Sequence, residues 1–152
     1  MTNFYPDPDT LALGIRQPWV ELILRGAKTI EVRSQNTRVR GLIYVYAARK
    51  WSEIPAAFDA AQGHDFDCAS LPTGMLVGSV EICHSRPASA SDAAAACVPA
   101  ALLEQQFAWE LRNPVRFTRP LAVQFLPYGV WFYPFRRRES HGRAAKTSKP
   151  VI

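Results

Sequence analysis

The amino-acid sequence predicts a small, barrel-like α+β domain. Short segments of alternating or β-branched residues recur along the chain and indicate six or seven strands. Two or three helical segments are inserted between them, without the regular strand–helix alternation of a doubly wound sheet. The chain has 152 residues, of which 48% are hydrophobic, so it has the length and composition to bury a single core.

Three strands are expected in the first third of the chain. Residues 10–16 and 28–34 alternate apolar with small or polar residues, which is the pattern of a strand with one buried face. Residues 42–48 are almost wholly apolar and rich in β-branched and aromatic side chains, which favours a buried strand. Residues 1–9 are rich in proline and aspartate, and we place the domain at residues 10–135.

A short helix is expected between the first two strands, over residues 17–26. Pro18 stands in its first turn, where proline is tolerated, and Gly26 is a typical stop residue. Glu21 precedes Arg25 by four positions, the favourable order for an ion pair on a helix. The apolar stripe that should pack on the sheet consists of Val20, Ile23 and Leu24.

The middle of the chain predicts a second helix and a fourth strand. Residues 51–62 have a helical pattern, and residues 63–73 are rich in turn residues and predict a loop. Residues 74–85 predict a strong strand, in which Gly74 and Gly78 indicate a bulge or a sharp bend.

The last third is less regular. The alanine-rich residues 88–104 predict either a helix broken at Pro99 or a partly ordered excursion that continues into a short helix, and their role stays open. Further strands are expected at residues 107–117, 121–127 and 129–135, the first of them ending in a turn at Asn113–Pro114.

The net charge of +5 is concentrated in two segments. Residues 136–152 hold six basic residues and one acidic residue, and they contain few apolar side chains, so we expect a mobile basic tail. Residues 16–50 hold eight basic and two acidic residues, whereas the rest of the domain is acidic. A basic segment on an otherwise acidic body favours a polyanionic partner.

The cysteines and the hydropathy pattern exclude several other classes of protein. Cys68, Cys83 and Cys97 are odd in number and widely spaced, so they predict neither a disulfide framework nor a zinc site, and we expect no metal or cofactor. No stretch is long and apolar enough to span a bilayer, and the first residues lack the pattern of a signal peptide. We therefore expect a cytoplasmic protein that does not bind membranes; its oligomeric state is not indicated.

The segment directly after the first helix brings three ionisable residues close together in sequence. By strand alternation Glu31 and Arg33 share one face and can pair, with Thr29 beside them. Lys28 falls on the opposite, apolar face, and it joins the other two only if the turn at Gly26 redirects it. Alternation alone therefore does not assemble the three residues. An exposed ion-pair set with no special function is one interpretation of this pattern.

The spacing Gly26-x-Lys28-x-x-Glu31-x-Arg33 matches the G-x-K-x-x-E-x-R signature of the ASCH family. The similarity extends to Gln17, Pro18, Trp19, Thr37, Arg40, Gly41, Ala47 and Ala48, and downstream to Gly74, Gly78, Trp109 and residues 129–135. The similarity covers residues 10–135. This part of the chain resembles the module of the eukaryotic transcription coactivator after which the family is named.

The resemblance implies a PUA-like β-barrel with a cleft beside the first helix that binds nucleic acid, with RNA favoured over DNA. Lysine and arginine would meet phosphates, a carboxylate would accept from a base amino group, and Trp19 would stack on an unpaired base. The side chains expected at this interface are Trp19, Lys28, Glu31, Arg33, Thr37, Arg38, Arg40, Arg49 and Lys50.

Two other functions remain open. Some ASCH proteins resemble ribonucleases or amidohydrolases acting on N(4)-acetylcytidine, and in such an enzyme Lys28 and Glu31 would be catalytic. The amidohydrolase pattern has a threonine where this chain has Glu31, and Glu81 is the one further carboxylate candidate. A protein-interaction adaptor that uses the tail and one face of the barrel is the third hypothesis.

Overall fold

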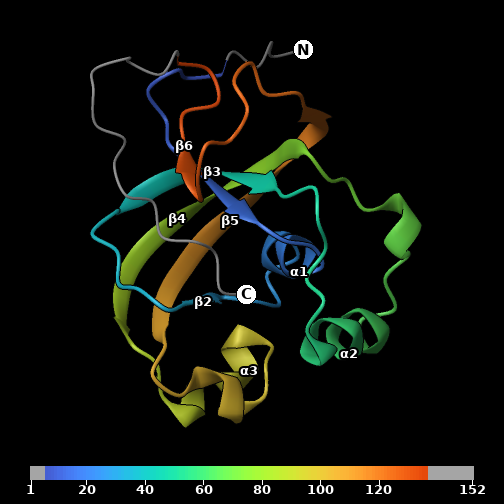
Figure 1. The fold of residues 1–152 in the computed structure, drawn as a ribbon, viewed down its shortest axis with the longest axis vertical. Helices are drawn as coiled ribbons and strands as arrows, with labels where there is room; N and C mark the ends of the chain where they lie inside the picture. Colours follow the sequence, from blue (N-terminus) through green and yellow to red (C-terminus); the bar gives the residue numbers. More distant parts are fainter. Residues whose placement is uncertain (1–5, 137–152) are drawn as a thin grey trace.

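A curled six-stranded sheet forms the body of the domain (Figure 1). The computed structural model describes residues 6–136. The strands are β1 (Ala12–Ile15), β2 (Ile30–Arg33), β3 (Gly41–Ala47), β4 (Met75–Pro87), β5 (Phe107–Leu121) and β6 (Trp131–Phe132). They lie in the order β2-β5-β4-β3-β1-β6, with β1 and β3 parallel and the other neighbours antiparallel. The expected small barrel-like α+β fold is therefore confirmed, with the sheet curled into a half-barrel.

The helices are short and lie at the ends and on one side of the sheet. They are α1 (Trp19–Leu24), α2 (Pro55–Gly63) and α3 (Ala93–Ala96), with 3-10 turns at Cys68–Ser70, Ala90–Asp92 and Ala100–Leu103. The helix expected over residues 51–62 begins at Pro55, because the residue before a proline disfavours helical backbone and Ile54 is extended. No helix among residues 6–136 has the length and apolar character needed to cross a membrane.

Helix α1 packs tightly against the sheet through its predicted apolar stripe. Val20 and Ile23 are fully buried, and Leu24 is partly buried against the same core. Gly78 of β4 lies at this contact: a Cβ atom at that position would lie 2.8 Å from a methyl carbon of Leu24 and would clash with the Val115 carbonyl. A side chain at position 78 would therefore push β5 away from β4, whereas the end of the Leu24 side chain could move aside.

The prediction of a turn at Asn113–Pro114 is wrong, because β5 continues through these residues. The pairing of β4 with β5 shifts register between Ser79 and Glu81, so the extra residues form a bulge, and Asn113 takes a positive φ of 53°. The side-chain amide of Asn113 donates to the Glu81 carboxylate at 2.6 Å. Long-range strand pairing thus overrides a local turn signal.

The strands expected near the C-terminal end are also shorter than predicted. Only Leu121 of the segment 121–127 belongs to a strand, as the last residue of β5. Within 129–135 the strand is confined to the two residues of β6. The amides of Gln124 and Phe125 donate instead to the Pro134 carbonyl, which joins the two segments as irregular loops.

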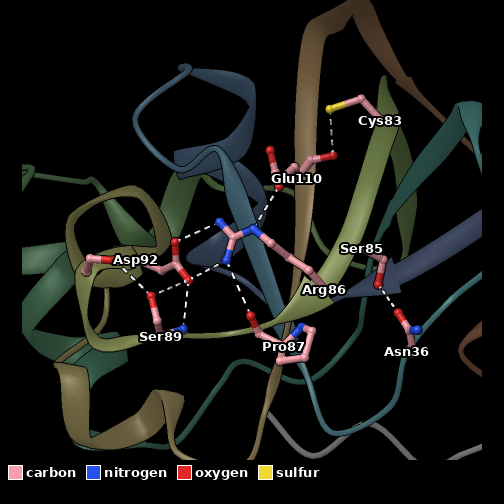
Figure 2. A network of polar contacts seen from close by, with 9 residues as sticks. Asn36, Cys83, Ser85, Arg86, Pro87, Ser89, Asp92 and Glu110 are labelled. Carbon is pink, nitrogen blue, oxygen red and sulfur yellow. Dashed lines mark hydrogen bonds and ion pairs between the residues drawn. The ribbon is translucent and has the colours of Figure 1, made fainter.

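The alanine-rich segment folds into a lobe at the end of β4 and β5 that contains α3 (Figure 1). Arg86 fastens this lobe to the sheet (Figure 2). Its guanidinium donates to both carboxylate oxygens of Asp92 at 2.8 Å and to Glu110 at 2.9 Å. Asp92 also accepts the Ser89 amide in a capping box. The segment is therefore a fixed part of the domain, which the sequence left open.

Candidate functional site

A tight turn after α1 brings the three motif residues together. Gly26 has a φ of +78°, and the amides of Ala27 and Lys28 both donate to the Leu22 carbonyl at 3.0 Å. Lys28 consequently precedes β2 and does not follow its alternation. The redirection at Gly26, on which the assembly of the motif depends, is thus observed.

The three side chains form one polar network centred on Glu31. Arg33 donates to Glu31 Oε2 through Nη2 at 2.8 Å and through Nε at 3.2 Å. Lys28 Nζ lies 3.9 Å from Glu31 Oε1, which is too long for a hydrogen bond, and donates to the Ala96 carbonyl of the lobe at 2.6 Å. Arg33 Nη2 also donates to the Gly14 carbonyl of β1 at 3.0 Å.

This network lies inside the protein. The side chains of Lys28, Glu31 and Arg33 are 2%, 6% and 7% exposed. The interpretation as an exposed ion-pair set is therefore wrong, and none of the three side chains offers a phosphate an exposed surface in this conformation. Because an uncompensated buried charge is costly, one carboxylate between two cations makes the network sensitive to the loss of any member.

Burial also controls the titration of Lys28. Removal from water lowers the pKa of the Lys28 ammonium below its usual range, and the nearby Glu31 carboxylate opposes this only in part. The neutral amine, which can act as a nucleophile or base, is therefore more accessible at Lys28 than at an exposed lysine.

The Trp19 ring packs against the Lys28 ammonium. The Lys28 ammonium lies 5.0 Å from the centre of the Trp19 ring, and Trp19 is only 2% exposed. The expected stacking of an unpaired base on Trp19 is therefore not possible in this conformation. The indole Nε1 is buried without a hydrogen-bond partner among the described residues.

The loop after β2 carries Thr37, Arg38 and Arg40. Thr37 is buried and shapes the loop: its amide donates to the Asn36 side chain and its hydroxyl accepts the Val39 amide. Arg38 and Arg40 are exposed. The Arg40 guanidinium donates to the carbonyls of Thr37 and Val39, at 2.9 and 2.8 Å, which holds it over the loop.

The other two basic residues expected at the interface lie at the opposite end of β3. Arg49 and Lys50 follow this strand and are exposed, whereas Arg38 and Arg40 precede it. Seven strand residues span on the order of 20 Å. The predicted basic residues therefore form two groups, one at each end of β3.

The sequence did not predict the second ion-pair partner of Glu21 on α1. Arg116 of β5 donates to both carboxylate oxygens of Glu21 at 2.8 Å, in addition to the expected Arg25–Glu21 pair at 2.6 Å. Burial raises the pKa of Glu21, but the two guanidinium groups outweigh it and the net pKa lies below the usual value. Partners 95 residues apart leave no local signal in the sequence.

The further carboxylate considered for an enzyme, Glu81, lies outside the Lys28 network. It accepts from Asn113 and forms an ion pair with Arg112 at 3.5 Å. No group of three or more histidine, cysteine, aspartate or glutamate side chains within residues 6–136 is arranged to hold a metal ion.

Comparison with known proteins gives a consistent identification. The ASCH domain family model matches residues 13–121. Activating signal cointegrator 1 from Homo sapiens and from Mus musculus is 34% identical over 77 residues, which is 46% of this chain but only 13% of the length of either relative.

Solved structures show the same fold. The ASCH protein of Zymomonas mobilis superposes with a TM-score of 0.57 at 14% identity, covering 84% of this chain and 88% of that chain. A single-substitution variant of the same protein gives a TM-score of 0.52 at 15% identity, with 82% and 88% covered. With the family model matching well over half of its length, this chain belongs to the ASCH domain family.

Proposed function

We propose that this domain, residues 10–135, binds nucleic acid through the exposed basic residues at the two ends of β3, and that RNA is the preferred ligand. The supporting observation is that four basic side chains are exposed and have no ion-pair partner among residues 6–136. Arg38, Arg40, Arg49 and Lys50 are exposed, and none of them forms an ion pair with a carboxylate of residues 6–136. Cations without a carboxylate partner are available to neutralise phosphates and release counterions.

The buried network has a supporting role in this proposal. Arg33 is the last residue of β2 and leads directly into the loop that carries Arg38 and Arg40. Its bonds to Glu31 and to Gly14 fix the start of that loop. Lys28, Glu31 and Arg33 would then position the interface, and direct contact of these three with a ligand would require the site to open.

Two further parts of the proposal concern the tail and the location of the protein. The basic tail, residues 136–152, would act as an additional electrostatic arm; residues 137–152 lie outside the described part of the chain.

The three cysteines are free thiols, which agrees with a cytoplasmic location because the cytosol keeps thiols reduced.

Fluorescence anisotropy with labelled single- and double-stranded RNA and DNA of one sequence tests the proposal. We expect the double variants Arg38→Ala/Arg40→Ala and Arg49→Ala/Lys50→Ala each to weaken binding. Each should also reduce the slope of log affinity against log salt by about one unit for every lost phosphate contact. Arg112→Ala is the matched control, because Arg112 is exposed but paired with Glu81. Absence of salt-sensitive binding to every nucleic acid would refute the proposal and favour the protein adaptor.

A second candidate function is hydrolysis of RNA or of a modified cytidine, and the environment of Lys28 favours it. A lysine with a lowered pKa, 3.9 Å from a carboxylate oxygen, has the composition of a general acid–base pair. Release of acetate from N(4)-acetylcytidine, or cleavage of short RNA, by the wild type would establish an enzyme. Loss of that turnover in Lys28→Ala, with the circular-dichroism spectrum retained, would assign it to this site.

A further inference from the structure

A groove of about 520 Å³ opens beside α2, apart from the Lys28 network. Three aromatic side chains form much of its wall: Trp51 before α2, Phe58 on the helix and Phe66 after it. Phe58 is 62% exposed, which is unusual for a phenylalanine and leaves its ring free to contact a ligand. The volume lies within the usual range for small-molecule sites.

The polar groups of the groove are few and specific. Ser52 lines it and is only 1% exposed, and its hydroxyl has no hydrogen-bond partner among the described residues. Because this hydroxyl is fully buried, the polar groups that a ligand in the groove can reach come from other residues. Gln62 and Asp65 also line the groove, adding an amide and a carboxylate. Apolar walls with a small number of placed polar groups are typical of a small-molecule pocket.

Basic side chains lie near the groove, whereas acidic side chains lie along its wall. Arg49 and Lys50 precede Trp51 in the chain without lining the groove, and the Arg49 side chain lies next to Gly74. The Arg25 guanidinium lies 4.4 Å from the centre of the Phe66 ring. Acidic side chains are exposed along the segment that forms the wall: Glu53, Asp59, Asp65 and Asp67. Phosphate is therefore favoured outside the groove, near these basic residues, and disfavoured at the wall, where an uncharged ring with hydrogen-bond donors fits.

We propose that this groove receives one unpaired nucleobase that carries an exocyclic amino group. The base would pack against the aromatic wall, its amino group would donate to Asp65, and its phosphate would lie at Arg49 and Lys50. Adenine, cytosine and guanine can donate in this way, whereas both exocyclic groups of uracil are carbonyl oxygens, which a carboxylate repels, and its one base-pairing donor is the ring N3–H. The phosphate contact rests on the proposed function, but recognition of the base does not, so the two can fail separately.

Short single-stranded RNAs composed only of A, C or U provide the first test, by anisotropy. We expect the A and C oligomers to bind more tightly than U, and Phe58→Ala to weaken their binding about fivefold or more. Asp65→Asn should reduce the preference for A and C over U, and asparagine suits the positive φ of 54° at this position. Leu126→Ala is the matched control, since Leu126 is exposed and does not line the groove.

Cys68 provides a second readout that needs no polynucleotide. This exposed thiol lines the groove, whereas Cys83 and Cys97 are partly buried and lie elsewhere. Free cytidine or adenosine should slow iodoacetamide alkylation of Cys68, measured by peptide mapping, while uridine should not. The alkylation of Cys83 should be unchanged, which controls for a general effect on thiol reactivity.

The outcomes separate this proposal from the proposed function. If Phe58→Ala and Asp65→Asn bind RNA like the wild type while the arginine and lysine variants do not, the groove inference is wrong and nucleic-acid binding stands. If no oligonucleotide binds but cytidine protects Cys68, the groove inference stands alone. Absence of protection by every nucleoside overturns it. So does protection only by a basic peptide with an apolar side chain, which would assign the groove to a protein partner.

Discussion

Glu31 accepts two hydrogen bonds from Arg33 inside the protein, and among residues 6–136 it is the single carboxylate paired with both Arg33 and Lys28. Replacing it with glutamine would leave two buried cations without a counter-charge. We expect Glu31→Gln to lower the free energy of unfolding by about 3–5 kcal/mol, measured by urea denaturation. Glu81→Gln is the control, because Glu81 is partly exposed. Equal denaturation midpoints for Glu31→Gln and the wild type would contradict the structural role.

Truncation of Ile23 tests the packing of α1. Ile23 is 1% exposed and belongs to the main core. Ile23→Ala should cost about 2–5 kcal/mol, because the rigid surroundings cannot collapse fully into the cavity. Leu42→Ala, at an exposed leucine of β3, should change stability by less than about 0.5 kcal/mol. An unchanged midpoint for Ile23→Ala would mean that α1 is peripheral to stability.

The pairing of Asp92 with Arg86 should appear as a pH dependence of stability. Hydrogen bonds from the Arg86 guanidinium, and then from the Ser89 amide, lower the pKa of Asp92 from 3.8 to about 2. Because the folded pKa is lower, the contribution is complete above the unfolded value and is lost as pH falls from 3.8 towards 2. The urea midpoints of Asp92→Asn and the wild type should differ near neutral pH and converge across this interval. A difference that is constant with pH would show that the Asp92 charge is not involved.

Removal of the basic tail should affect binding and leave the fold intact. Residues 136–152 carry a net charge of +5 and few apolar side chains. Truncation after Phe135 should weaken nucleic-acid binding and flatten its salt dependence, measured by anisotropy at several salt concentrations. The thermal transition of the truncated protein should be retained. Its loss would instead assign a structural role to the tail.

The parts of the fold that depend on local signals were predictable. Pro18 and Gly26 limit the first helix correctly to within two residues, and the Glu21–Arg25 pair forms as expected. Apolar runs and hydrophobic alternation also located β1 to β4 within a few residues. The turn signal at Asn113–Pro114 misled, because pairing with β4 across many residues decides the course of β5.

The burial of the motif was not predictable in the same way. Strand alternation places side chains relative to a strand, but Lys28 precedes β2 and its position depends on the backbone of the Gly26 turn. Its nearest acceptor, the Ala96 carbonyl, is 68 residues away and belongs to a lobe whose folding the sequence left open. Contacts of this kind depend on tertiary packing and produce no periodic pattern.

The span of β3 has a consequence for how ligand length controls affinity. Under the proposed function, the basic groups at the two ends of β3 would act as a bivalent receptor, in which the second contact forms at the effective concentration set by the first. An oligonucleotide too short to reach from Arg40 to Arg49 gains one group of contacts only, whereas a longer one gains both. Affinity should therefore increase in a step at the spanning length, and either double variant should abolish that step.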